Sequence, residues 1–244
     1  MRAIILAAGR GSRMKKLTEQ TPKCLLQFQA KALLDWQIEA IRGAGIEEIA
    51  IVTGYKRELL ANRGLVEFHN ERWFETNMVE SLTKAESWLQ EAPCIVSYSD
   101  IVYEASAITS LMNSDSSIAI TYDPNWRGLW ERRFDDPLED AETFRLAADN
   151  KVMEIGKQPQ SLSEIEGQYM GLLRFTPQGW AEVRRIRSAL SDLESDGVHM
   201  TSLLQGVIEQ NILQVEAIGY QGMWAEFDSE TDFDGIDQYE VKNA

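Results

Sequence analysis

Groups that can bind phosphate are concentrated in one stretch near the N-terminus, residues 3 to 26. An apolar run of strand length leads into Gly9 and Gly11, and the cations Arg13 and Lys23 follow. Because a glycine has no Cβ atom, it lets backbone N–H groups approach a phosphate closely, and successive N–H groups in such a turn form an anion-binding concavity. The stretch therefore predicts a buried strand followed by a turn that binds a nucleoside triphosphate.

Two well-known phosphate motifs do not match this stretch. The phosphate loop of many NTPases requires four residues between its glycines and then Gly-Lys-Ser/Thr, which this stretch lacks. The dinucleotide fingerprint requires a third glycine where this chain has Met14. It also requires an acidic residue at the end of the second strand, where this chain has Thr53 and Gly54. Both types of site are excluded.

Residue types and spacing in the stretch form a longer pattern, a Gly-x-Gly-x-Arg turn, then Leu-Thr, then Pro-Lys-x-Leu. Its members are Gly9, Gly11, Arg13, Leu17, Thr18, Pro22, Lys23 and Leu25. This pattern resembles the signature of the nucleotidyltransferases that make sugar nucleotides and CDP-alcohols. The resemblance implies an α/β, three-layer Rossmann-like fold with a mostly parallel sheet, and catalytic roles for Lys23 and Arg13. Nucleotide contacts are expected from Leu6, Ala7, Ala8, Gly9, Gly11 and Ser12.

Strand and helix signals alternate along the rest of the chain, which favours right-handed parallel β-α-β units. The expected strands are 49–52, 65–68, 94–98, 117–122, 212–218 and 223–227, and the expected helices are 34–41, 56–62, 78–89, 177–193 and 201–210. Residues 144–147 and 152–155 flank the turn formers Asp149, Asn150 and Lys151 and predict a β-hairpin. The tail with Glu240 and Lys242 is expected to form a short surface helix. We expect one domain, residues 1–244, with a lid-like excursion at about 123–160 that contains the hairpin.

The overall charge argues against some classes of partner. The 24 Lys and Arg residues and 39 Asp and Glu residues give a net charge of −15, which disfavours binding to nucleic acid or to an anionic membrane. Cys24 and Cys94 lie in apolar runs, which predicts buried thiols in a reducing compartment. The sequence shows no signal peptide and no apolar stretch near the ~18 residues of a membrane span, so we expect a cytoplasmic enzyme. The sequence leaves open whether it forms a homo-oligomer.

Two aspartates at the ends of expected strands are candidate metal ligands. Ser99 and Asp100 follow one strand, and ligands of open α/β sheets bind outside the carboxyl ends of the strands. Trp224, Glu226 and Asp228 alternate, so they would share one face of a strand, where two buried carboxylates need a compensating cation. The resemblance implies that Asp100 and Asp228 bind Mg²⁺ and that Ser99 contacts the nucleotide. The alternatives are a turn-capping aspartate and an edge strand with a solvent-facing acidic row.

Acceptor contacts are expected from the second half of the chain. Lys157 lies in Gly-Lys-Gln-Pro, which resembles, with two departures, the family's Glu-Lys-Pro element, whose lysine reaches the acceptor phosphate. Its alternative is a solvated lysine. Tyr169 and Gly171 lie in a run that resembles the segment placed against the acceptor. Aromatic and acidic residues could hold an ammonium group, namely Trp126, Trp130, Tyr169, Trp224, Glu226 and Asp228. Arginines would instead suit an acceptor with a carboxylate, namely Arg127, Arg132 and Arg133. The sequence does not decide between these.

Residues 77–82 resemble a stretch of the cytidylyltransferase branch in which Asn77 and Ser81 lie near the base. The resemblance implies Mg²⁺-dependent transfer of CMP from CTP to a small phosphorylated alcohol or phosphonate, with pyrophosphate as the other product. Phosphocholine, 2-aminoethylphosphonate and phosphoglutamine are the candidate acceptors. A phosphate monoester has its second pKa near ~6, so the nucleophile is already a dianion at neutral pH and direct in-line attack needs no general base. His69 and His199 are therefore interpreted as structural.

Two other functions remain open. A hexose-1-phosphate uridylyl- or thymidylyltransferase would share the signature, and base selectivity would distinguish it. The second is a regulatory module that binds nucleotide without turnover, because function resides in sites and not in the fold. The presence of Lys23, Asp100 and Asp228 argues against such a module.

Overall fold

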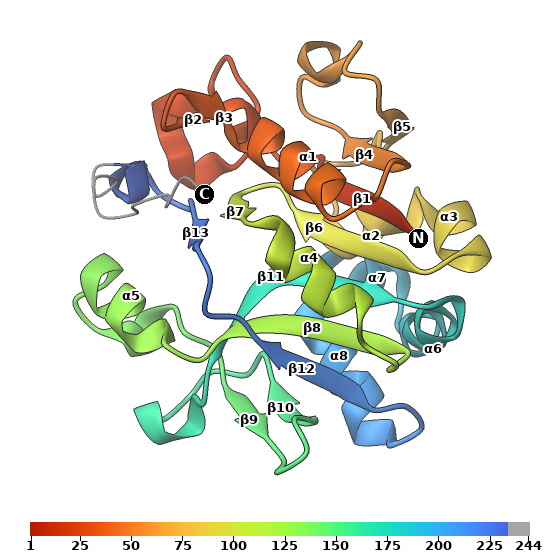
Figure 1. The fold of residues 1–244 in the computed structure, drawn as a ribbon, viewed down its shortest axis with the longest axis vertical. Helices are drawn as coiled ribbons and strands as arrows, with labels where there is room; N and C mark the ends of the chain where they lie inside the picture. The colour runs from red at the N-terminus through yellow and green to blue at the C-terminus, as the bar shows by residue number, and fades with distance from the viewer. Residues whose placement is uncertain (234–244) are drawn as a thin grey trace.

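A computed structural model describes residues 1–233, and its centre is a seven-stranded sheet (Figure 1). In spatial order the strands are β12 (Val215–Gly219), β8 (Ile118–Asp123), β11 (Gln168–Phe175), β6 (Cys94–Tyr98), β1 (Arg2–Ala7), β4 (Ile49–Thr53) and β5 (Val66–His69). Neighbouring strands are parallel, except that β11 is antiparallel to both of its neighbours. The α/β fold with a mostly parallel sheet is thereby confirmed.

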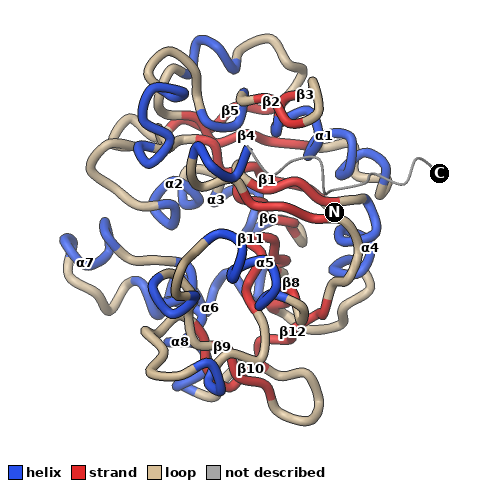
Figure 2. Tube along the Cα trace, turned by 90° about the vertical axis from the view of Figure 1, so that its left-hand side faces the viewer, coloured by secondary structure: helices blue, strands red, loops and turns tan. Residues whose placement is uncertain are grey.

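Helices cover both faces of this sheet, which explains why its strands are apolar on both sides. One face carries α1 (Leu33–Gly43) and α4 (Ala105–Met112), and the other carries α2 (Met78–Thr83), α3 (Glu86–Glu91), α6 (Pro177–Arg187) and α8 (Met200–Gln210) (Figure 2). Alternate residues of β1 face the two layers, because side chains alternate along a strand. Ala3 and Ile5 pack with α1 and α4, whereas Ile4 and Leu6 pack with the other helices. The predicted three layers are present.

Shorter elements lie around this core. They are β2 (Gln27–Phe28), β3 (Lys31–Ala32), β7 (Ile101–Tyr103), β9 (Phe144–Leu146), β10 (Val152–Ile155), β13 (Trp224–Glu226), α5 (Trp126–Arg133), α7 (Asp192–Gly197) and the 3-10 turns η1 (Ser12–Thr18), η2 (Lys23–Leu25), η3 (Arg57–Leu60), η4 (Pro137–Glu139), η5 (Leu162–Glu164) and η6 (Glu230–Phe233). β9 and β10 form the predicted antiparallel hairpin. β13 pairs with β7, so it returns the end of the chain to the segment that follows β6.

Three predicted helices are wrong in extent. The helix expected over 78–89 is two helices, because Ala85 leaves helical geometry (φ −95°, ψ 19°) between α2 and α3. The helix expected over 177–193 stops at the end of α6, because Ser191 starts α7 with a capping box: its side chain bonds the Glu194 backbone, and the Glu194 carboxylate bonds the Ser191 N–H. The helix expected over 56–62 is only the short turn η3.

The excursion after β8 is more ordered than the sequence indicated. It contains α5, and the side chains of Trp126 and Trp130 are buried in the core with α1 and α4. Cys24 and Cys94 are buried free thiols, as predicted. The predicted tail helix with Glu240 and Lys242 lies outside the described residues. Among residues 1–233, no helix has the length and apolar character needed to cross a membrane.

Candidate active site

The turn after β1 is shaped so that Lys23 lies across Gly11. Gly11 has a φ of 72°, and a Cβ atom at this position would lie 2.9 Å from Lys23 Cδ, closer than side chains tolerate. The Thr18 hydroxyl donates to the Gly11 carbonyl at 3.0 Å, and Met14 is fully buried in a cluster with Phe28. The glycine and lysine of the signature are therefore adjacent in space, and the loop between them is anchored to the core.

Lys23 lies between the two aspartates that the sequence assigned to a metal. Its Nζ donates to Asp100 Oδ2 at 2.8 Å and to Asp228 Oδ1 at 2.7 Å. Asp100 follows β6, and Asp228 follows β13, where the N–H of Phe227 donates to the Asp100 carbonyl at 2.9 Å. The structure thus brings together three residues from distant parts of the chain.

Charges in this group stabilise one another in their ionised forms. Burial lowers the pKa of Lys23, but Asp100 and Asp228 raise it by more, so the ammonium stays charged. Burial raises the pKa of Asp228, but Lys23, then Arg13 and Arg133, lower it by more. Arg13 Nη2 lies 3.5 Å from Asp228 Oδ1, and its side chain is 69% exposed. Arg13 can therefore reach a ligand above the aspartate.

A cavity of about 290 Å³, here called the turn cavity, opens beside this group. It includes eight of the nine residues predicted to contact the nucleotide, namely Leu6, Ala8, Gly9, Gly11, Ser12, Asn77, Ser81 and Ser99, together with Arg13, Lys23, Asp100 and Asp228. Asn77 caps α2 by accepting from the Met78 N–H, and the Ser81 hydroxyl accepts from Asn70 Nδ2. Ala7 packs with α1 on the other face of the sheet. Four residues that carried no signal of a nucleotide contact in the sequence also line this cavity, namely Trp73, Thr76, Met78 and Tyr98.

A second cavity of about 250 Å³, here called the hairpin cavity, lies next to the first. Four predicted acceptor contacts line it, namely Trp130, Tyr169, Gly171 and Glu226. The two cavities share Arg13, Met78, Tyr98 and Asp228. Gly171 has a φ of 76°, and a Cβ atom there would lie 2.8 Å from Tyr98 Cδ2, so this glycine makes room for the shared tyrosine. Residues that carried no signal in the sequence also line this cavity, namely Tyr98, Asp140, Glu142, Thr143, Gln168 and Thr201. His199, interpreted as structural, lines it as well.

Two predicted acceptor contacts lie away from the hairpin cavity. Trp224, the first residue of β13, is buried, and its Nε1 donates to Asp123 Oδ2 at 3.1 Å. Lys157 points away from the site, with Nζ 3.3 Å from Glu154 and 3.7 Å from Glu209. Trp224 and Glu226 therefore line different cavities: Trp224 lines one together with Gly128 and Arg132, and Glu226 lines the hairpin cavity.

The lining of the hairpin cavity is acidic. It contains the carboxylates of Asp140, Glu142, Glu226 and Asp228 but a single arginine, Arg13. Burial raises the pKa of Glu142, while a bond from the Thr201 hydroxyl at 3.4 Å opposes that shift. Gln168 fixes the backbone at Glu142, since its Nε2 donates to the Glu142 carbonyl at 2.9 Å. Asp140, Glu226 and Asp228 each lie within 4.0 Å of an arginine or lysine group, whereas Glu142 forms no such pair within residues 1–233. Glu142 is therefore the carboxylate of this lining that is left for a positively charged ligand.

The three arginines of the excursion lie in different surroundings. Arg127 is paired with Glu131 on the surface of α5, and Arg132 is exposed near Trp224. Arg133 is buried and binds Glu226 at 2.8 Å and Asp232 at 2.9 Å. The sequence could not distinguish these three neighbours, because only the helical turn decides which side each one faces.

The aspartate pair has the properties of a site for a hard cation. Asp100 Oδ1 is buried and accepts no hydrogen bond from the described part of the chain. Within residues 1–233 no group of three or more His, Cys, Asp or Glu side chains is arranged to hold a metal ion. Mg²⁺ is commonly held by one or two carboxylates, with water and substrate phosphates completing its octahedron. Asp100 and Asp228 therefore fit a magnesium ion that is shared with a nucleotide.

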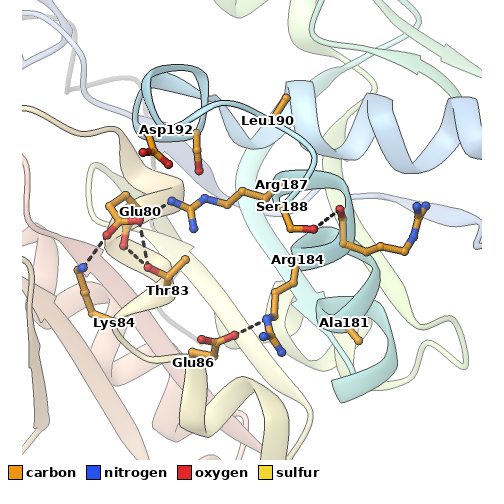
Figure 3. Close-up of a pocket in the computed structure, with 12 residues that line it drawn as sticks. Glu80, Thr83, Lys84, Glu86, Ala181, Arg184, Arg187, Ser188, Leu190 and Asp192 are labelled. Carbon is orange, nitrogen blue, oxygen red and sulfur yellow. Dashed lines mark hydrogen bonds and ion pairs between the residues drawn. The ribbon is translucent and has the colours of Figure 1, made fainter.

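A larger cavity, of about 670 Å³, lies between α2–α3 and α6–α7 and is lined by paired charges (Figure 3). Arg187 reaches across it to Glu80 at 2.5 Å, Lys84 binds the same carboxylate at 2.5 Å, and Arg184 pairs with Glu86. Its lining includes neither the turn after β1 nor the two aspartates. These ion pairs join α2 and α3 to α6.

Comparison with known proteins agrees with this geometry. Residues 3–203 match the family model of the MobA-like NTP transferase domain. The chain belongs to this family. A CTP:phosphoglutamine cytidylyltransferase from Campylobacter jejuni is 38% identical over 250 residues, which cover 96% of this chain and 98% of that protein. A choline-phosphate cytidylyltransferase from Streptococcus pneumoniae is 41% identical over 86 residues, which cover 34% of this chain and 38% of that protein.

Solved structures agree on the fold of this MobA-like NTP transferase. The inositol-1-phosphate CTP transferase from T. maritima superposes with a TM-score of 0.78 at 19% identity, covering 100% of this chain and 97% of that one. The CTP:phosphocholine cytidylyltransferase from Streptococcus pneumoniae superposes with a TM-score of 0.71 at 21% identity, covering 96% of both chains. The predicted nucleotidyltransferase family and enzyme class are confirmed. Asp228 lies beyond residues 3–203, so its place in the site is known from geometry.

Proposed function

We propose that this nucleotidyltransferase transfers CMP from CTP to a small phosphorylated acceptor that carries an ammonium group. The observation that carries the proposal is the acidic hairpin cavity, which joins the turn cavity through Arg13, Tyr98 and Asp228. In this arrangement the triphosphate lies at the turn after β1 and the acceptor enters from the hairpin side. The two reacting phosphorus groups meet beside Lys23, where the cavities join.

CTP is favoured as the nucleotide for two reasons. The similar proteins from Campylobacter and Streptococcus are both named as cytidylyltransferases, and the first is similar over nearly its whole length. Asn77 and Ser81 also line the turn cavity on the side of α2, as the resemblance implies for residues near the base. A hexose-1-phosphate uridylyl- or thymidylyltransferase remains the alternative.

The chemistry is attack of an acceptor phosphate oxygen on the α-phosphorus of CTP. A bond forms between that oxygen and the α-phosphorus, the bond from the α-phosphorus to the bridging oxygen breaks, and pyrophosphate leaves with the bonding electrons. Because the phosphate dianion is already a nucleophile, positioning and charge stabilisation are the main demands on the protein. Lys23 binds the α-phosphate and the acceptor phosphate, and the exposed Arg13 binds the β- and γ-phosphates.

Asp100 and Asp228 would hold Mg²⁺ against the phosphates. The ion would supply neutralisation of the negative charge that collects at the reacting centre and on the leaving group. Lys23 donates to both carboxylates, so its ammonium group lies at the place where the phosphates would meet them.

The acceptor class follows from the charges of the hairpin cavity. Three of the four carboxylates already have arginine or lysine partners, so the charge that remains for an acceptor is that of Glu142. Glu142 with Tyr98 and Tyr169 offers a negative and aromatic surface to a cation. Phosphocholine, 2-aminoethylphosphonate and phosphoglutamine all carry an ammonium group, whereas a hexose-1-phosphate does not. Arg133 is occupied by Glu226 and Asp232, which weakens the case for it as the ligand of an acceptor carboxylate.

The test is pyrophosphate release with Mg²⁺, in which CTP, UTP, ATP, GTP and TTP are each combined with phosphocholine, 2-aminoethylphosphonate, phosphoglutamine, glycerol phosphate and glucose-1-phosphate. We expect turnover with CTP and one of the three ammonium-bearing acceptors. Turnover only with glucose-1-phosphate and UTP or TTP would contradict the proposal and support a sugar nucleotidyltransferase. Nucleotide binding without turnover in any combination would support a non-catalytic module.

A further inference from the structure

Arg133 joins three carboxylates around the end of β13. Its Nη1 donates to Glu226 Oε2 at 2.8 Å, its Nε donates to Asp232 Oδ1 at 2.9 Å, and its Nη2 lies 3.8 Å from Asp228 Oδ2. The side chain is only 8% exposed, and its guanidinium lies 5.3 Å from the ring centres of both Trp130 and Phe134. A planar guanidinium enclosed in this way has one orientation, so it fixes the carboxylates that it binds.

Asp232 in turn fixes the backbone that carries Asp228. Its Oδ2 accepts from the N–H groups of Asp228 at 2.7 Å and Ser229 at 2.8 Å. The side chain is 5% exposed, and the neighbouring Phe233 ring packs on the buried Phe227 ring at 4.7 Å. The position of the Asp228 carboxylate therefore depends on a residue four positions further along the chain.

We propose that Arg133 and Asp232 are positioning residues that hold Asp228 in the geometry needed to bind a divalent cation, an inference that rests on the proposed function. Glu226 and Asp232 both lie close to Asp228, and Arg133 donates to each of them. Arg133 pairs with both, and Asp232 is thus free to hold the two N–H groups of the turn. With either residue removed, the Asp228 carboxylate follows the pull of Lys23 and Arg13 instead.

A consequence concerns the excursion after β8. Arg133 is the last residue of α5, so this arginine connects the excursion to the C-terminal side of the site. The orientation of Asp228 then depends on whether α5 is packed in its place. Cation affinity would consequently report whether α5 is docked.

The test measures Mn²⁺ binding by electron paramagnetic resonance, with a CTP analogue whose α,β-bridging oxygen is replaced by methylene and with no acceptor. Outer partners of metal ligands typically contribute about 10–100-fold to metal affinity, so Arg133→Gln and Asp232→Ala should weaken Mn²⁺ binding by roughly that factor. Asp232→Asn should lose less, because its amide oxygen still accepts from the two N–H groups. Arg132→Gln, a change at the exposed neighbour, is the matched control and should bind Mn²⁺ as the unmodified protein does.

Far-ultraviolet circular dichroism and thermal melting identify the variants that fold. A folded Arg133→Gln or Asp232→Ala variant with unchanged Mn²⁺ affinity would overturn the proposal. A variant with a lower maximal rate but an unchanged half-saturating concentration of Mg²⁺ would also overturn it. That result means that fewer molecules are active, and not that each molecule binds the cation more weakly. If Arg133→Gln does not fold, equal Mn²⁺ affinity in Asp232→Asn and Asp232→Ala is the contradicting result. Because the binding measurement contains no acceptor, a wrong acceptor assignment leaves its outcome unchanged.

Discussion

The turn cavity and the hairpin cavity share a wall but are built from different parts of the chain. The turn cavity combines residues 6–13 and Lys23 with α2, the loop before it and the end of β6. The hairpin cavity takes its residues from α5, the hairpin, β11 and α8. A phosphate chain can be bound by one short turn, whereas recognition of a variable acceptor draws on scattered positions.

Charge separates the two cavities in the same way. Arg13 and Lys23 stand at the turn cavity, where a triphosphate needs them, while carboxylates dominate the hairpin cavity. Asp228 belongs to both, so it connects nucleotide, cation and acceptor. If this division of labour is right, changes in one cavity should affect one substrate, and changes at the shared aspartate should affect the whole reaction.

The largest effect is expected for Asp228→Asn and Asp100→Asn. Each change keeps the shape of the side chain but removes a charge that balances Lys23 and would hold Mg²⁺. Outer partners of metal ligands already contribute about 10–100-fold, so loss of a ligand should lower kcat by roughly 10³-fold or more. Steady-state rates over a range of Mg²⁺ concentrations measure this. A variant that retains full activity would refute the assignment of that aspartate.

The next largest effect is expected for Lys23, which lies where the two cavities join. Lys23→Ala removes a positioned charge that acts on the transferred phosphoryl group, and removal of one such group typically lowers kcat by about 10²–10³-fold. Binding of CTP, measured by calorimetry, should weaken much less than kcat falls. Lys16→Ala, at an exposed position in the same loop, is the control. Equal losses in binding and turnover would mean that Lys23 only binds the nucleotide.

A smaller and more selective effect is expected for Glu142→Gln. Loss of a charged partner for the acceptor ammonium should raise the acceptor KM by about tenfold, which corresponds to ~1.4 kcal/mol, and leave the CTP KM unchanged. Glu139→Gln, at an exposed position three residues earlier, is the control. A rise in the CTP KM with no change for the acceptor would reverse the assignment of the two cavities.

The same residue gives a prediction for pH. Burial raises the pKa of Glu142, so this carboxyl becomes protonated at a higher pH than an ordinary one. As pH falls through the raised pKa, the acceptor KM should increase, and the Gln variant should lack this component. The free energy of unfolding changes with pH in the opposite direction. Because the pKa of Glu142 is higher in the folded than in the unfolded protein, its contribution to stability is fully present below the unfolded-state pKa and is lost as pH rises through the folded-state pKa. Glu142→Gln should therefore melt no lower than the unmodified protein at pH 7.

The smallest effect is expected for Lys157→Ala. The resemblance to the Glu-Lys-Pro element implies a contact with the acceptor phosphate, but the side chain is half exposed and lies near Glu154 and Glu209. Exposed ion pairs of this kind contribute ~0–1 kcal/mol, so kcat and both KM values should change by less than about threefold. A large rise in the acceptor KM would show that the hairpin turns Lys157 into the site when the acceptor binds.

The parts of the two cavities that are built from neighbouring residues could be predicted from the sequence. Gly11, Lys23 and the end of β1 are close in sequence, and their spacing carries the chemistry, so this part of the turn cavity was predicted, whereas Trp73, Thr76 and Tyr98 were not. The resemblance implied a nucleotide contact for Ala7, but strand alternation turns its side chain to the other face of the sheet. The sheet and hairpin followed from apolar runs and turn residues.

The hairpin cavity was predicted only in part, because tertiary packing assembles it. Glu142, Gln168 and Thr201 come from three separate segments and carry no local signal that would distinguish them from surface residues. Trp224 was assigned to the site from the period of its strand, but its indole donates to Asp123 and lines a different cavity. The difference in exposure between Arg132 and Arg133 likewise depends on the helical turn of α5 and on the position of β13.

The most direct test of the account compares two acceptors that differ only in charge. The most active of phosphocholine, 2-aminoethylphosphonate and phosphoglutamine is compared with its analogue in which an uncharged alkyl group replaces the ammonium group, with CTP and Mg²⁺ at saturation. If the acidic hairpin cavity selects the ammonium group, kcat/KM should fall at least about tenfold with the uncharged analogue, and Glu142→Gln should reduce that ratio. Equal kcat/KM for the two acceptors would contradict the assignment of the hairpin cavity and the function proposed from it.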